Sequence, residues 1–283
     1  MPDKMMKVIH EMLAGKTSED RDQLIAKLSD STKALPSMSD LRTIGEEFWE
    51  YFTSVDLSVG DSQPHVQLVA WGWLAQAFRQ ARAAFLLCDA GFSDSAPANA
   101  RAAVEHGVYL ALLASVRDKE LVLDKLESTF LKNTDRLRDS GATNEDQSEL
   151  IQALLEVLPD ITPNDGTGWV TVFEQVCKKL ETGEDVYEYW RQLCAMIHPG
   201  FVSAAPFVVS SVDVDTWEVP ERLSREPMDS PDSRVILQMA IGGCAWAAWA
   251  AESLFDSISF TGSLLEAKVR RLAFIPLELK QSK

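Results

Sequence analysis

The clearest candidates for chemistry are Arg191 and His198, which lie seven positions apart in one predicted helix. Seven residues bring an α-helix back to nearly the same face, so the two side chains share a stripe with Tyr187 and Cys194. Histidine can take or give a proton near neutral pH, and arginine can hold a phosphate group. The pair therefore suits acid–base cleavage of a phosphodiester bond.

A helix over residues 186–198 must position this polar stripe. Thr182 followed by Asp185 predicts a capping box at its start, and Pro199 with Gly200 predicts its end. Apolar residues at helical spacing predict a buried stripe about 100° round the helix from the polar one: Val186, Trp190, Leu193 and Ile197. The polar stripe should lie beside the core, where a groove would be lined.

The spacing of Arg191 and His198 resembles the Arg-x4–6-His motif of the HEPN superfamily, whose all-α domains occur in RNA-cleaving toxins and phage-defence proteins. The segment Ala-Arg-Ala-Ala-Val-Glu-His at residues 100–106 is similar to an Arg-x3-Glu helix in bacterial relatives of that superfamily. The resemblance implies an all-α multi-helix bundle with a HEPN-like core. It also implies five residues that line or support a groove, the three on the earlier helix facing Arg191 across it: Tyr187, Cys194, Arg101, Glu105 and Tyr109.

The function that the resemblance implies is a metal-independent endoribonuclease of a phage-defence or toxin–antitoxin type, with no cofactor. His198 would act as general base or acid on a ribose 2′-hydroxyl or the leaving 5′-oxygen, while Arg191 holds the scissile phosphate. Superfamily members pair two motif helices across a dimer interface, so we expect a homodimer with a composite site. Expected partners are RNA (tRNA or mRNA) and a cognate antitoxin or defence-system protein.

Two non-catalytic alternatives remain open from the residues. Gln192 follows Arg191, where superfamily members usually carry Asn, Asp or His. The chain could be a helical interaction or scaffold protein that binds a basic partner, or a small-ligand sensor that uses Arg191 and Arg101. A net charge of −16 disfavours a general binder of nucleic acids, so any RNA contact should be local.

Composition describes a globular chain of 283 residues with 46% hydrophobic and 25% charged residues. Its four cysteines show no CxxC or zinc-ligand spacing, and the charged first 15 residues do not resemble a signal peptide. We therefore expect a cytoplasmic protein with no bound metal and no membrane contact.

The apolar periodicity predicts helices almost throughout. Residues 1–58 should form an N-terminal helical segment that packs on the core, and residues 59–283 a single HEPN-like helical domain. After residue 58 we expect helices at 65–92, 101–116, 118–139, 145–158, 169–180, 186–198, 235–251 and 263–273. Residues 207–219 alternate β-branched and polar side chains, which predicts a small hairpin or extended flap at the wall of the groove.

Residues 235–251 are the least polar stretch of the chain, yet they are short for a membrane span and rich in Ala and Gly. Gly242 and Gly243 would allow neighbouring helices to approach closely. We expect a helix surrounded by other helices.

Overall fold

The computed structural model describes residues 36–55, 63–139, 168–198 and 231–280. Within these ranges the chain is helical, with one isolated β-bridge between Leu180 and Leu279, so the predicted all-α bundle is confirmed. The predicted helices before residue 36 and at 145–158, and the flap at 207–219, lie outside the described residues. The elements are α3 (Met38–Ser54), α4 (Pro64–Asp89), α5 (Ala96–Ser115), α6 (Lys119–Asp139), the 3₁₀ turn η1 (Gly168–Thr171), α8 (Phe173–Lys179), α9 (Gly183–Ile197), α11 (Pro231–Leu254) and α12 (Leu264–Arg271).

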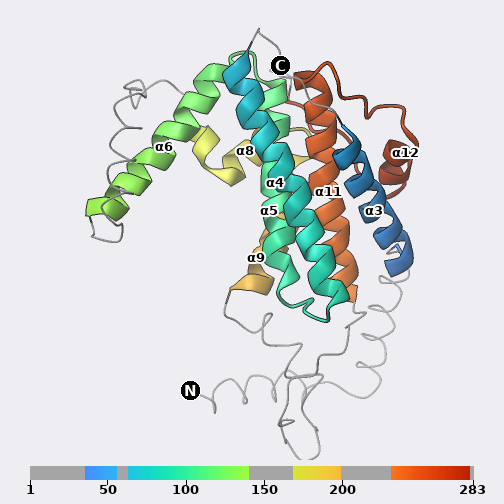
Figure 1. Cartoon of the computed structure of the whole chain (residues 1–283). Helices are drawn as coiled ribbons and strands as arrows, with labels where there is room; N and C mark the ends of the chain where they lie inside the picture. The colour runs from blue at the N-terminus through green and yellow to red at the C-terminus, as the bar shows by residue number, and fades with distance from the viewer. Residues whose placement is uncertain (1–35, 56–62, 140–167, 199–230, 281–283) are drawn as a thin grey trace, which may run out of the picture.

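Three long helices, α4, α5 and α11, run side by side and form the centre of the bundle (Figure 1). Helix α3 packs on α4 and α11, and α12 packs on α3 and α11. On the other side, α9 lies on α5, while α6 projects away from the bundle (Figure 1). The candidate stripe on α9 is therefore carried by the outer surface of a rigid three-helix core.

The tightest contact in this core joins α5 and α11 through glycine. A Cβ atom at Gly243 would lie 2.5 Å from the carbonyl carbon of Ala103, and one at Gly107 would lie 2.4 Å from the carbonyl oxygen of Gly243. Neither helix has room for a side chain at this crossing. The approach that the sequence predicted for Gly243 is confirmed.

Helix α11 is buried along almost its whole length, as predicted for residues 235–251. By length and composition, Ser233–Leu254 is the one stretch of the described residues that could cross a membrane, but 83% of its apolar window is buried inside the bundle. Burial among other helices accounts for its apolar character.

Some predicted helix limits were wrong. The 101–116 helix begins earlier, at Ala96, because Pro97 lies in its first turn, where proline is tolerated. The predicted helix at 169–180 is interrupted at Val172, whose backbone is extended (φ −117°, ψ 107°), so η1 and the short helix α8 take its place.

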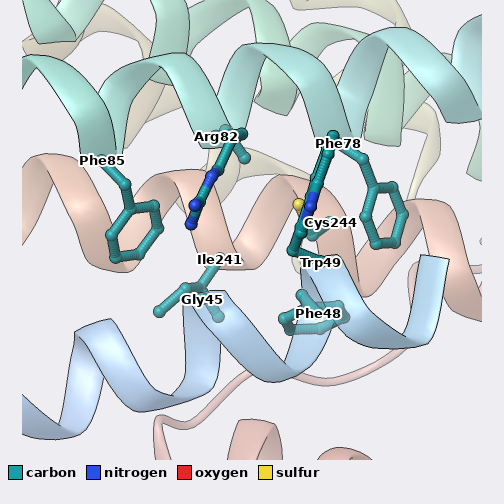
Figure 2. A pocket seen from close by; sticks show the side chains of 9 residues that line it. Gly45, Phe48, Trp49, Phe78, Arg82, Phe85, Ile241 and Cys244 are labelled. Atoms are coloured by element: carbon teal, nitrogen blue, oxygen red, sulfur yellow. The ribbon is translucent and has the colours of Figure 1, made fainter. Parts of the chain in front are cut away.

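Helix α3 is fixed by its cap and by its packing against α4. The hydroxyl of Ser37 accepts a hydrogen bond from the backbone N–H of Asp40 and so caps the start of the helix. Figure 2 shows the seam between α3, α4 and α11, where Arg82 of α4 reaches towards α3. Arg82 pairs with Glu46 and lies 5.7 Å from the ring centroid of Trp49. The space left in this seam is ≈ 10 Å³, about enough for one water molecule and too small for a ligand.

Replacing Tyr51 by phenylalanine is expected to leave the free energy of unfolding unchanged or to raise it by up to about 1 kcal/mol. The buried Tyr51 hydroxyl has no hydrogen-bond partner among the described residues, and burial, aided by Glu252, raises its pKa to about 12. Urea denaturation measures the change. Tyr51→Ala is the control, because losing the ring contact with Phe260 at 5.8 Å should cost roughly 3 kcal/mol. A clear loss of stability in Tyr51→Phe would mean that the hydroxyl is bonded.

Candidate functional site

Helix α9 carries the candidate residues. Its C-terminal end was predicted correctly, whereas its N-terminal cap was not. It ends at Ile197 with His198 extended (φ −73°, ψ 141°), as Pro199 predicts. The capping box was wrong: Thr182 is left-handed (φ 56°) and its side chain makes no capping bond. The reason is the tight turn from α8, in which a Cβ at Gly183 would lie 2.0 Å from the carbonyl oxygen of Cys177.

The apolar stripe of α9 faces α5, although less completely than predicted. Val186 and Leu193 are buried, whereas Trp190 and Ile197 are half-buried. The polar stripe therefore runs along the solvent edge of the contact between α5 and α9.

Arg191 and His198 are both exposed on this edge. The Arg191 side chain is 60% exposed, and its Nη1 lies 3.2 Å from Oε2 of Glu188, one turn earlier. His198 is exposed at the C-terminal end of the helix. Both groups are accessible to a large substrate. A surface ion pair such as Arg191–Glu188 is weak enough for a phosphate to displace Glu188.

The α5 residues Arg101 and Glu105 reach α9 at Trp190 and Cys194. Arg101 Nε lies 3.2 Å from Glu105 Oε1, and the Trp190 indole N–H donates to the same oxygen at 2.7 Å. The Arg101 guanidinium also lies 5.6 Å from the centroid of the Trp190 ring and donates to Cys194 Sγ at 3.7 Å. Arg101 thus reaches the polar stripe at Cys194, while Glu105 provides the acceptor that the half-buried indole N–H needs. That the pair faces Arg191 stays a prediction. Arg101 and Glu105 position α9.

The two candidate tyrosines belong to a row of aromatic rings that links α4, α5, α8 and α9. Tyr109 packs between Trp73 and Phe173 at 6.1 Å from each, and burial, with Glu105 adding, raises its pKa to about 12. Tyr187 stacks on Trp190 at 5.6 Å and donates to Glu174 Oε2 at 3.3 Å. Tyr109 is therefore a packing residue, while Tyr187 lies beside the candidate stripe.

Cys194 is a free, half-buried cysteine whose surroundings disfavour the thiolate. Partial burial raises the pKa of its thiol, although the neighbouring Arg101 acts in the opposite direction. The group remains a thiol and lines the edge of the α5–α9 contact.

A second groove in the bundle is larger than the seam between α3, α4 and α11, but it lacks the chemistry of the α9 edge. It has a volume of ≈ 350 Å³ and lies between the end of α5, the C-terminal part of α11 and the segment from Pro276 to Leu279. Within the described part of the chain, Glu278 is the one ionisable side chain that lines it, so these residues offer no acid–base pair. Among the described residues, no group of three or more His, Cys, Asp or Glu side chains could hold a metal ion.

Sequence reasoning missed Glu174, which bonds to Tyr187. The ion pair of Arg191 with Glu188, by contrast, is one that a spacing of three residues on a helix favours. Glu174 gave no signal, since it lies in another helix and its approach depends on the turn at Gly183.

The fold and the α9 edge define an all-α bundle protein with an exposed arginine–histidine pair. Residues 67–215, more than half of the chain, match a family described as a family of unknown function (DUF5677). The chain belongs to that family, and the matched region contains every candidate site residue. No curated protein and no solved structure matches the chain.

Proposed function

We propose that this protein is a metal-independent endoribonuclease of a phage-defence or toxin–antitoxin type that acts in the cytoplasm. The observation that carries the proposal is the exposure of Arg191 and His198 on one stripe of α9. The resemblance of their spacing to the HEPN motif supplies the reaction class.

The chemistry follows from the two side chains. His198 takes the proton from a ribose 2′-hydroxyl, or gives one to the 5′-oxygen that leaves. Arg191 binds the non-bridging oxygens of the scissile phosphate and stabilises the charge that develops on them. The bond from phosphorus to the 5′-oxygen breaks as the 2′-oxygen bonds to phosphorus, so the product carries a 2′,3′-cyclic phosphate.

A second copy of the chain would complete this site. Seven residues of helix separate the two Cα atoms by about 10 Å along the axis, and the α9 edge is open to solvent. A phosphate bound by one helix alone would remain largely hydrated, which weakens its interaction with arginine. Two α9 helices facing each other across a two-fold axis would enclose it and place two arginines and two histidines together.

The protein is expected to be a dimer at micromolar concentration, with α9 near the two-fold axis. Light scattering gives the mass. An Ala195→Cys variant should form a covalent dimer on mild oxidation, because Ala195 is exposed on α9, while Gln76→Cys on the exposed face of α4 should not. A strict monomer, or equal cross-linking of both variants, would contradict the composite site.

The direct test is cleavage of single-stranded RNA and tRNA by the purified dimer in excess EDTA. We expect products with 2′,3′-cyclic phosphate ends, and a rate that falls as salt is added because salt weakens the ionic contact between arginine and the RNA phosphate. Failure of the wild-type dimer to cut any RNA in a panel of tRNAs and mRNAs would count against the proposal.

The second candidate is a non-catalytic interaction protein, and the pairing of basic side chains favours it. Arg191 is paired with Glu188 and Arg101 with Glu105, in a chain with a net charge of −16. Such a surface suits a basic protein partner, and a cognate antitoxin or a defence-system protein could be that partner. The sensor alternative has less support, because Arg101 is already held by Glu105 and Trp190.

A further inference from the structure

His65, in the first turn of α4, lies between two carboxylates of α6. Its Nδ1 is 2.8 Å from Oε2 of Glu120, and its Nε2 is 3.0 Å from Oε1 of Glu127. A neutral imidazole carries one N–H and can donate to only one of these oxygens. The arrangement is satisfied on both sides only when the ring carries two protons and a positive charge.

This contact joins a projecting helix to the core. Glu120 and Glu127 are seven positions apart, so they lie on one face of α6, and the ring bridges two helical turns. Helix α6 leaves the bundle at an angle to α4 (Figure 1). Because the two oxygens contact opposite nitrogens of the ring, the three groups do not converge on a metal ion.

We propose that His65 is a pH-controlled clasp that holds α6 on the start of α4 while the imidazole is doubly protonated. When the ring loses a proton, one N–H···O bond is replaced by a nitrogen lone pair facing a carboxylate, which is repulsive. The contact between α6 and α4 then loosens, while the α4–α5–α11 core, which does not depend on this contact, stays folded.

The direction of the effect follows from the neighbours of the ring. The hydrogen bond to Glu120 raises the pKa of His65, partial burial opposes this, and the bond to Glu127 adds to the rise. The main causes of the rise are the two carboxylates of α6. None of the charged side chains on the other helices packed on α4 is among these main causes: Glu47 and Glu50 of α3, Arg101 and Glu105 of α5, and Glu252 of α11. The pKa of the folded state is above that of the unfolded state. The stabilisation is therefore complete below the ordinary histidine pKa and is lost as pH rises through the raised value.

The test combines proton NMR with hydrogen exchange on the full-length protein. Only four histidines occur in the chain, so the His65 signal can be assigned by its absence in His65→Gln. We expect His65 to titrate above 6.5. After correction for intrinsic exchange rates, amide protection in α6 should fall about 3- to 10-fold between pH 6 and pH 9, which is the range expected for two exposed ion pairs. Protection in α5 serves as the internal reference.

Three variants complete the design. His65→Gln should show low α6 protection at both pH values, and Glu120→Gln should lower the pKa of His65. His106→Gln is the matched control, because the His106 ring bonds to the Ala102 carbonyl of its own helix at 2.7 Å and has no role in the clasp. A His65 pKa at or below 6.5 would overturn the proposal. So would α6 protection in His65→Gln that equals wild type at pH 6, or the absence of α6 protection in wild type.

Discussion

Arg191→Ala and His198→Ala are each expected to lower the rate of RNA cleavage by about 10²-fold or more. The first removes the group proposed to hold the phosphate, and the second removes the proton acceptor or donor. Both side chains are exposed, and neither is part of the core, so both variants should melt at the wild-type temperature. Single-turnover assays with excess enzyme in EDTA separate this loss from weaker RNA binding.

Each variant has a matched control on the same fold. His106→Ala removes a histidine that bonds within its own helix, and Arg79→Ala removes an exposed arginine of α4. Both should keep wild-type activity and the wild-type mass in light scattering. If His198→Ala cuts RNA as fast as wild type, the cleavage belongs to another site, and the interaction-protein candidate becomes the better one.

Gly243→Ala is expected to lower the free energy of unfolding by about 1–3 kcal/mol, and Gly243→Leu by at least the upper end of that range. A new Cβ would meet backbone atoms of Ala103 and Val104 at 2.5 to 2.8 Å, so α5 and α11 would have to separate. Stability should fall even though alanine has a higher helix propensity than glycine, which by itself would stabilise the variant by up to about 1 kcal/mol.

Gly72→Ala provides the same substitution without the clash. Gly72 lies on the exposed face of α4, and a Cβ there would have nothing within 4 Å. Its free energy of unfolding should therefore rise by up to about 1 kcal/mol. Urea melts of both variants give opposite signs if the helix crossing is as described, and a gain in both would disprove the close approach.

The sequence was sufficient for features that depend on neighbouring residues. Pro199 marked the end of α9, and the apolar run with its glycines marked α11 as a core helix. Each of these depends on local backbone chemistry or on a periodic pattern, which a single sequence displays directly.

Features set by contacts between helices could not be predicted. Thr182 has the spacing of a capping residue, yet the packing of Gly183 on Cys177 places it in a left-handed turn. The hydrogen bond from the Trp190 indole N–H to Glu105 likewise had no signal in the sequence. Both outcomes depend on how one helix is seated on another, which no local pattern encodes.

The glycine crossing of α5 and α11 also affects how the chain folds during synthesis. Helix α11 lies beyond the family-matched region and follows α5 by more than one hundred residues. Because of this separation along the chain, α5 leaves the ribosome on the order of ten seconds before α11. Throughout that interval the face of α5 that will receive α11 has no partner. At its closest approach to Gly243 of α11, that face carries Ala103 and Gly107. Such small residues expose little apolar area to other polypeptide chains. This crossing therefore exposes little apolar area on the nascent chain before α11 is synthesised.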